Sequence, residues 1–270
     1  MSLTSRRVID GIKGKVGAYF KLPSPPYGKA SFWDSVFHNC TPSTVVEWGE
    51  LTLNNHLMEY DYRLRSITDD SLSEETRTTF AETINVIPEM NQKRSKTKIM
   101  ILGCGYSRLG EDMATNGWKG IVQVDIVSKA ILDLSKRCTS LDETVMQLVE
   151  DDAAVLSAFD SGTMDAVIDK GLVDTLFLGD EHNKIRDIMR STHRVLRPDG
   201  TLSIFSFSAP KYLLPKLMRT DDLREDPNLL WHSVKVQQLD TALLYCFKKS
   251  NAPEPINVAS RSLLTRRKYR

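Results

Sequence analysis

The chain has 270 residues, of which 41% are hydrophobic and 26% are charged, with a formal net charge of +1. This length and apolar content suit one large domain with a substantial core. The balanced charge argues against a general nucleic-acid-binding protein, and no apolar run approaches the length of a membrane span, about 18 residues. The cysteines Cys40, Cys104, Cys138 and Cys246 form no CxxC pair. We therefore expect free thiols, a reducing compartment and no metal site.

Residues 1–26 form a distinct N-terminal segment. The first twenty carry four basic side chains against one acid, Asp10, a pattern shared by transit peptides and by solvated amphipathic helices. The stretch has little serine and is interrupted by glycines, so we favour a cytoplasmic location, with a mitochondrial one as the alternative. Pro23, Pro25 and Pro26 then predict a stiff, extended linker.

An aromatic-rich stretch follows and ends in a helix predicted over residues 45–65. Its aromatic side chains include Phe32, Trp33, Phe37 and Trp48. They suit ordinary core packing and also a helical lid that closes over a ligand, and the two roles are compatible. Residues 66–96 are polar, and we expect a mostly exposed insertion there, because long connections in compact domains are often functional or mobile.

From Lys98 onward the sequence has the pattern of the first half of a nucleotide-binding βαβ unit. The apolar run Ile99–Leu102 predicts a buried strand. Gly103 and Gly105 follow, and residues without a Cβ let the backbone turn tightly and pass close to a ligand. After a helical pattern and a second apolar run comes Asp125, about 20 residues beyond the turn, where such folds place a carboxylate for ribose hydroxyls.

The position three residues after the second glycine discriminates between cofactors. A dinucleotide site needs a third glycine there, but this chain has Arg108, which breaks the pyrophosphate cradle. S-adenosylmethionine has a ribose and no pyrophosphate, and it fits better. The alternatives are a glycine turn that only reverses the chain, which the spacing of Asp125 disfavours, and a nicotinamide dehydrogenase, which Arg108 and the extra acid Asp152 disfavour.

Helices and strands continue to alternate after Asp125. Helices are predicted over residues 128–137, with Ile131, Leu132 and Leu134 facing the sheet, over 181–196 and around 212–218. Strands are predicted over residues 145–149, 164–168, 201–207, 233–239 and 243–249, with a turn at Pro198-Asp199-Gly200. The expected fold class is α/β: a Rossmann-like, doubly wound, mostly parallel seven-strand sheet with a C-terminal antiparallel hairpin. The domain spans 27–249, and the basic tail 250–270 is predicted to be disordered, an arm for an acidic partner or RNA being the alternative.

Three motifs carry a resemblance to a known family. The run ILGCGYSRLGEDM resembles the cofactor turn of class I, seven-strand S-adenosylmethionine-dependent methyltransferases. The runs FWDSVF followed by VVEW, and AVIDKGLVDTL, are similar to those of a eukaryotic methyltransferase-like group. That group includes lysine methyltransferases of elongation factor 1-alpha and of citrate synthase. The resemblance covers about Phe32 to Lys249.

The resemblance implies a set of cofactor-binding residues. The turn residues Leu102, Gly103, Cys104 and Gly105 would pass beneath the methionine moiety and the ribose. Asp125 would bind the ribose hydroxyls, and Ile126 would pack on the adenine. Asp152, with Ala153 beside it, would read the adenine amino group, although three adjacent acids leave that assignment open by one residue.

The resemblance also implies the parts nearest the chemistry. Asp169 would border the methyl group and is the candidate catalytic residue, while its alternative role is to cap the following helix. Lys170 and Gly171 complete that motif. Trp33 and Trp48 would fold over the site.

The expected activity is methyl transfer to a lysine of a protein substrate. Binding to a membrane or to nucleic acid is not expected. Transfer from a sulfonium needs positioning and desolvation more than an acid–base pair. A lysine must first lose a proton, which an apolar, aromatic channel favours. A small-molecule acceptor, an RNA acceptor and an inactive binding scaffold are the alternatives.

Overall fold

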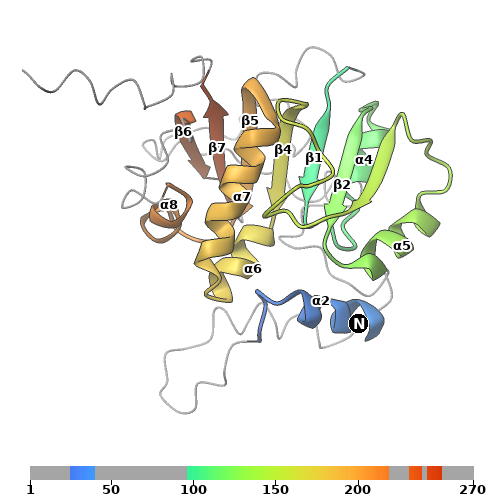
Figure 1. Ribbon diagram of the computed structural model, residues 1–270, viewed down its shortest axis with the longest axis horizontal. Helices are drawn as coiled ribbons and strands as arrows, with labels where there is room; N and C mark the ends of the chain where they lie inside the picture. The colour runs from blue at the N-terminus through green and yellow to red at the C-terminus, as the bar shows by residue number, and fades with distance from the viewer. Residues whose placement is uncertain (1–24, 40–95, 219–230, 239–241, 251–270) are drawn as a thin grey trace, which may run out of the picture.

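The computed structural model describes residues 25–39, 96–218, 231–238 and 242–250 (Figure 1). The sequence-based expectations for residues 1–24, the helix over 45–65, Trp48, nearly all of the insertion 66–96 and the tail after residue 250 lie outside these described residues. The strands are β1 (Ile99–Leu102), β2 (Ile121–Asp125), β3 (Met146–Glu150), β4 (Met164–Lys170), β5 (Leu196–Ser206), β6 (Trp231–Gln238) and β7 (Leu243–Lys249). The helices are α2 (Ala30–Asn39), α4 (Leu109–Thr115), α5 (Ser128–Arg137), α6 (Leu172–Leu178), α7 (His182–Val195) and α8 (Pro210–Met218).

The strands form one seven-stranded sheet in the order β3-β2-β1-β4-β5-β7-β6. β1 to β5 pair in parallel, and β7 pairs antiparallel with both β5 and β6. In the predicted hairpin, Val234 lies opposite Phe247 and Gln238 opposite Leu243. The sheet therefore confirms the expected fold class, including the antiparallel strands at its C-terminal end.

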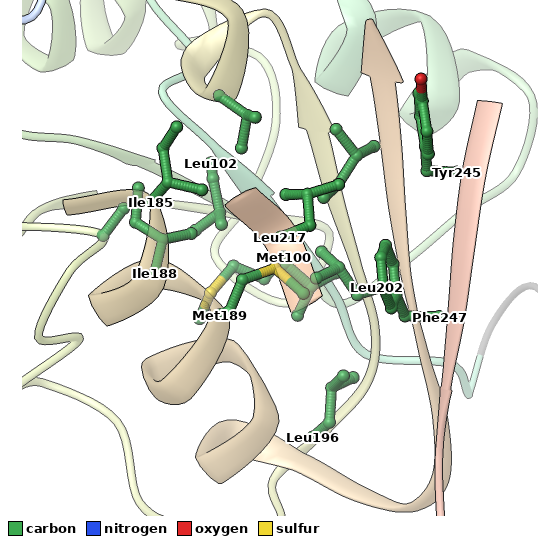
Figure 2. Packing of buried hydrophobic residues seen from close by; sticks show 14 of the residues in the cluster. Met100, Leu102, Ile185, Ile188, Met189, Leu196, Leu202, Leu217, Tyr245 and Phe247 are labelled. Carbon is green, nitrogen blue, oxygen red and sulfur yellow. The ribbon is translucent and has the colours of Figure 1, made fainter. Parts of the chain in front are cut away.

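Both faces of the sheet are covered because alternate residues of a strand point to opposite sides. On one face, Ile99 and Ile101 of β1 pack with residues of α4 and α5, such as Leu109 and Leu134. On the other face, Met100 and Leu102 pack with residues of α7 and α8. Figure 2 shows part of this second cluster, with Ile185, Ile188 and Met189 of α7 facing Met100, Leu102 and Leu202 of the sheet.

Two local predictions need correction. Leu132 was expected to face the sheet, but it is 53% exposed, while Ala130 and Leu134 are fully buried. At 3.6 residues per turn these two share a face, and Leu132 lies on the opposite one. The turn predicted at Pro198-Asp199-Gly200 lies inside β5, where Asp199 has φ 62° and the pairing with β4 shifts register between Met164 and Ala166. The strand therefore begins earlier than predicted and accommodates the turn as an irregularity.

Among the described residues, no helix has the length and apolarity needed to cross a membrane. The described histidine, cysteine and acidic residues also form no cluster of three or more that could hold a metal ion.

Candidate cofactor site

A pocket opens at the edge of the sheet where β1, β2 and β4 end. Figure 1 shows α2 lying across this edge. Of the residues expected at the site, those that line the pocket are Trp33, Gly103, Cys104, Gly105, Asp125, Ile126, Asp152 and Ala153. Leu102 is buried in the core directly before the turn, and Asp169 is buried beside the pocket; neither is among the described residues that line it. The carboxyl ends of parallel strands are where α/β sheets bind ligands.

The glycine turn has the backbone conformation that the sequence predicted. Gly103 has φ 56° and Gly105 has φ 48°, in the left-handed region that favours glycine. A Cβ on Gly103 would lie 2.9 Å from the Leu172 Cβ, and a Cβ on Gly105 would lie 3.3 Å from the Phe37 Cζ. The turn is therefore enclosed from two sides, by α6 and by α2.

A third glycine, Gly110, lets α4 pack closely against the sheet, and this role was not predicted from the sequence. Arg108 stands where a dinucleotide site needs glycine, but Gly110 lies two residues further on, in α4. A Cβ on Gly110 would lie 2.5 Å from the Gln123 Cδ on β2. Close packing of helix on strand is the role of the third glycine in nucleotide-binding turns. In this chain Gly110 makes that contact.

Asp125 connects the end of β2 to the glycine turn. Its Oδ2 accepts the Gly105 N–H at 2.8 Å, and its Oδ1 accepts the Val127 N–H at 2.9 Å. A carboxylate has about four acceptor positions, so these two bonds leave acceptor capacity for ligand hydroxyls. Burial raises the pKa of Asp125, and the backbone donors oppose that rise.

The acids after β3 differ in their contacts. Asp151 uses both carboxylate oxygens within its own turn: Oδ1 accepts the Asp152 N–H at 2.8 Å, and Oδ2 accepts the Ala158 N–H at 2.9 Å. Asp152 accepts the Ala154 N–H at 2.8 Å through Oδ1. Both residues line the pocket, and Ile126 beside them is 47% exposed. Because both carboxylate oxygens of Asp151 already accept backbone hydrogen bonds, Asp152 is better suited to bind a ligand.

Aromatic rings from the N-terminal segment form one wall of the pocket. Ring centroids lie 6.2 Å apart between Tyr27 and Trp33, 6.1 Å between Trp33 and Phe37, and 4.7 Å between Phe37 and Tyr106. The Trp33 Nε1–H donates to the Tyr27 carbonyl at 2.7 Å, which fixes the indole. Trp33, which was expected to fold over the site, lines the pocket, and so does Tyr106, which was not predicted from the sequence.

The other end of this segment is attached to the start of α7. Lys29 forms an ion pair with Glu181, and the Lys184 Nζ donates to the Gly28 carbonyl at 3.2 Å. A Cβ on Gly179 would lie 2.5 Å from the Gly28 nitrogen, so the two backbones approach closely. The segment thus crosses the pocket from α7 to α5.

Helix α5 holds the residues that follow the glycine turn. The Tyr106 hydroxyl donates to the Asp133 Oδ2 at 2.5 Å, and the Arg137 guanidinium donates to the carbonyls of Tyr106 at 3.1 Å and Ser107 at 2.8 Å. Hydrogen bonds from Lys129 and Tyr106 lower the pKa of Asp133 to about 2. Sequence reasoning missed these residues, although the spacing of Lys129, Asp133 and Arg137 places them on one face of a helix.

Asp169 is buried near the end of β4, just before α6. Its Oδ1 accepts the Gly171 N–H at 3.2 Å, and its Oδ2 accepts the Val173 N–H at 3.1 Å. Burial and the nearby Asp174 raise its pKa to about 8, against the opposing effect of these N–H groups. These contacts support the helix-capping role, and a direct catalytic role for Asp169 finds no support among them.

The raised pKa of Asp169 predicts a specific pH dependence of stability. Because the folded protein binds this proton more tightly than the unfolded chain, the contribution of Asp169 should fall as pH rises from about 4 to about 8. Asp169→Asn should cost about 1 kcal/mol at pH 5, where one acceptor is lost. At pH 9 the variant should gain about 2–5 kcal/mol relative to the wild type, because no charge is buried.

Urea unfolding of both proteins at pH 5, 7 and 9 measures this difference. Other titrating groups contribute equally to both proteins, so the free-energy difference between them isolates Asp169. Parallel stability curves across this pH range would contradict the prediction.

Comparison with known proteins agrees with this geometry. Residues 100–204 match the family model described as a methyltransferase domain. A curated relative from Homo sapiens, "eEF1A lysine and N-terminal methyltransferase", is 26% identical over 126 residues, covering 46% of this chain and 18% of the relative. Another, "EEF1A lysine methyltransferase 4" from Bos taurus, is 21% identical over 196 residues, covering 69% of this chain and 64% of the relative.

The chain spans less than two thirds of the length of both curated relatives. A solved structure, that of a SAM-dependent methyltransferase from Methanosarcina mazei, is 16% identical, covers 59% of this chain and 95% of its own, and has a TM-score of 0.42, too low to carry an inference. The match over residues 100–204 and the two relatives confirm the resemblance seen in the three motifs. Residues 100–204 therefore match a methyltransferase domain, and this region resembles the class I, S-adenosylmethionine-dependent type.

Proposed function

We propose that this protein is an active methyltransferase that uses S-adenosylmethionine to methylate a lysine side chain of a protein. The observation that carries the proposal is the pocket itself. It combines the left-handed glycine turn, a carboxylate at the end of β2 bonded to that turn, and an aromatic wall across the opening. A scaffold that only binds a partner has no need for this combination.

The residues present fit the cofactor. Asp125 keeps acceptor capacity for two ribose hydroxyls, Ile126 offers an apolar surface for adenine, and Asp152 an acceptor for its amino group. When bound, S-adenosylmethionine supplies a methyl group already activated for displacement. The task left to the protein is to orient the reactants and exclude water.

The chemistry of the described wall is compatible with an amine acceptor. Phe37 and Tyr106 are buried, and Trp33 packs against them, so this wall of the pocket is largely apolar. An apolar site disfavours the ammonium form and lowers the pKa of a lysine from its ordinary value of about 10.4. The amine is then the dominant form nearer neutral pH, and only that form can attack the methyl group.

The printed names of the relatives support lysine as the acceptor. Both name the elongation factor eEF1A and lysine, and one also names N-terminal methylation. At 21% to 26% identity these names motivate the acceptor class and do not identify the substrate of this chain.

The test is methylation of cell-extract proteins by the purified chain with isotope-labelled S-adenosylmethionine, followed by mass spectrometry. We expect label on the ε-amine of one or a few protein lysines, with eEF1A as the first candidate. The control is Asp125→Ala, which should lose the label.

Other outcomes discriminate among the alternatives. Label on a protein α-amine, on RNA or on metabolites alone would overturn the lysine proposal while leaving methyl transfer intact. No label on any fraction, with cofactor binding shown by calorimetry, would favour an inactive scaffold.

A further inference from the structure

Asp174 of α6 is a buried carboxylate that attaches the end of β5 to this helix. It is 2% exposed. Its Oδ2 accepts the Phe207 N–H at 2.8 Å. Its Oδ1 accepts the hydroxyl of Ser206 and, at 3.4 Å, that of Ser208. One side chain therefore binds three donors at the end of β5 and in the residues 207–209 that connect β5 to α8, which we call the β5 loop.

Tyr245 of β7 holds the same loop from a second direction. Tyr245 belongs to the buried cluster of Figure 2, and its hydroxyl donates to the Ser208 carbonyl at 2.5 Å. Burial and the nearby Asp174 raise the pKa of Tyr245 well above its ordinary value, so the hydroxyl remains a donor. Two buried polar side chains, one from a helix and one from a strand, thus fix one short loop, and such networks make a structure rigid.

The β5 loop lies at the same edge of the sheet as the pocket. Lys170, the last residue of β4, lines the pocket and is paired in the sheet with Phe205 of β5. Because β4 and β5 are parallel, the residues that follow them lie side by side at the carboxyl edge, where α/β sheets bind ligands. Residues 207–209 are not among the described residues that line the pocket. The β5 loop is therefore a neighbour of the cofactor pocket and not one of its walls.

Helix α6 separates the pocket from the β5 loop. Its residues Leu172, Thr175 and Leu176 line the pocket. Asp174 lies on the opposite face, because a helix turns by about 100° per residue. The β5 loop is thus held against the side of α6 that faces away from the cofactor.

The other sides of the pocket are already assigned. Asp125 at the end of β2 and Asp152 after β3 lie on the adenosine side, beyond β1 in the strand order β3-β2-β1-β4-β5. The aromatic wall with Trp33 and Phe37 covers the opening towards α5. An acceptor amine must reach the methyl group from a side that neither part occupies. The ends of β4 and β5 offer that side.

We propose that Asp174 and Tyr245 are positioning residues that hold the β5 loop as a fixed wall for the acceptor. The inference rests on the proposed function and deepens it, because a protein acceptor must bind largely outside the pocket. Neither residue is among the described residues that line the pocket, so both act through the loop. A loop that is already ordered loses less conformational entropy when a partner binds than a loop that must be ordered on binding.

Two variants release the loop in different ways. Asp174→Ala removes the carboxylate, and Tyr245→Phe removes only a hydroxyl. Hydrogen exchange measured by mass spectrometry should be faster in both variants for the peptide that contains residues 206–209, because the Phe207 N–H or the Ser208 carbonyl loses its partner. Calorimetry should show binding of S-adenosylhomocysteine within about threefold of the wild type.

Steady-state kinetics test the acceptor role directly. The acceptor is the protein that carries the label in the extract experiment above, after purification. Its KM should rise at least tenfold in Asp174→Ala and about three- to tenfold in Tyr245→Phe, while kcat stays within about twofold. This division between KM and kcat is expected for lost acceptor binding, whereas general damage to the fold would also lower kcat and cofactor affinity.

Asp165→Ala is the matched control. Asp165 is also buried and accepts a backbone N–H, that of Lys98 at 2.6 Å, but it lies near the beginning of β4, at the other end of the strand. This variant should lose stability and keep the wild-type acceptor KM. An unchanged acceptor KM in both loop variants, or an equal rise in Asp165→Ala, would overturn the inference and leave methyl transfer intact. If Asp174→Ala does not fold, Tyr245→Phe decides the matter. A wild-type chain that labels no protein would instead refute the proposed function, and the acceptor role with it.

Discussion

Replacing Asp125 with alanine is expected to weaken S-adenosylhomocysteine binding about 10- to 100-fold, the loss of about 1–3 kcal/mol of hydrogen bonding to a charged acceptor. The Asp125 carboxylate holds the glycine turn through Gly105 and lines the pocket with acceptor capacity left for ribose hydroxyls. Its removal deletes the ligand contact and also frees the Gly105 N–H. Isothermal titration calorimetry measures the change, and no change in affinity would contradict the assignment.

Two controls separate the ligand contact from general damage. Asp160→Ala removes an exposed aspartate in the loop before β4 and should leave the affinity unchanged. Asp125→Asn retains one acceptor oxygen and should lie between the wild type and Asp125→Ala. Thermal unfolding without ligand shows how much of the Asp125→Ala effect comes from a disturbed turn.

The raised pKa of Asp125 adds a pH dependence with a definite sign. Because burial raises this pKa, the carboxyl becomes protonated at a higher pH than an ordinary aspartate does. Protonation removes the negative charge and one acceptor, so affinity for the ligand should decline as pH falls, beginning at a higher pH than an ordinary aspartate would cause. The decline should be smaller in Asp125→Asn, whose side chain does not titrate.

Gly105→Ala is expected to reduce both cofactor affinity and stability. With φ 48°, a residue other than glycine in this left-handed conformation costs about 1–2 kcal/mol. The new Cβ would also lie 3.3 Å from the Phe37 Cζ, so either the ring or the turn must shift. Because Phe37 packs on Tyr106 and its helix covers the pocket, we expect affinity for S-adenosylhomocysteine to fall at least tenfold, about 1.4 kcal/mol.

Gly117→Ala provides the matched control for that substitution. Gly117 has φ 86°, also in the left-handed region, but a Cβ there meets nothing within 4 Å. It should lose stability through backbone strain while binding the cofactor with normal affinity. If the two variants bind equally well, the contact between Phe37 and the glycine turn does not contribute to the site.

Several features of the protein were determined by local sequence. The apolar run Ile99–Leu102, the glycines after it and Asp125 predicted strand, turn and acid, and each lies where expected, because short-range patterning determines buried strands and positive φ. The hairpin of β6 and β7 could also be predicted from local sequence, because its two strands are neighbours in the chain.

Other features required the tertiary structure. Some contacts join residues that are far apart in the chain. Tyr106 contacts Asp133, Phe37 lies against Gly105, and the sheet register places Lys170 beside Gly103. No local pattern encodes such distances. The role of Asp169 was undecided between catalysis and capping, because one residue type serves both, and only its contacts with Gly171 and Val173 favour the cap. Hydrogen bonding and burial depend on which elements pack together, and that is decided by the whole sheet rather than by any one stretch of sequence.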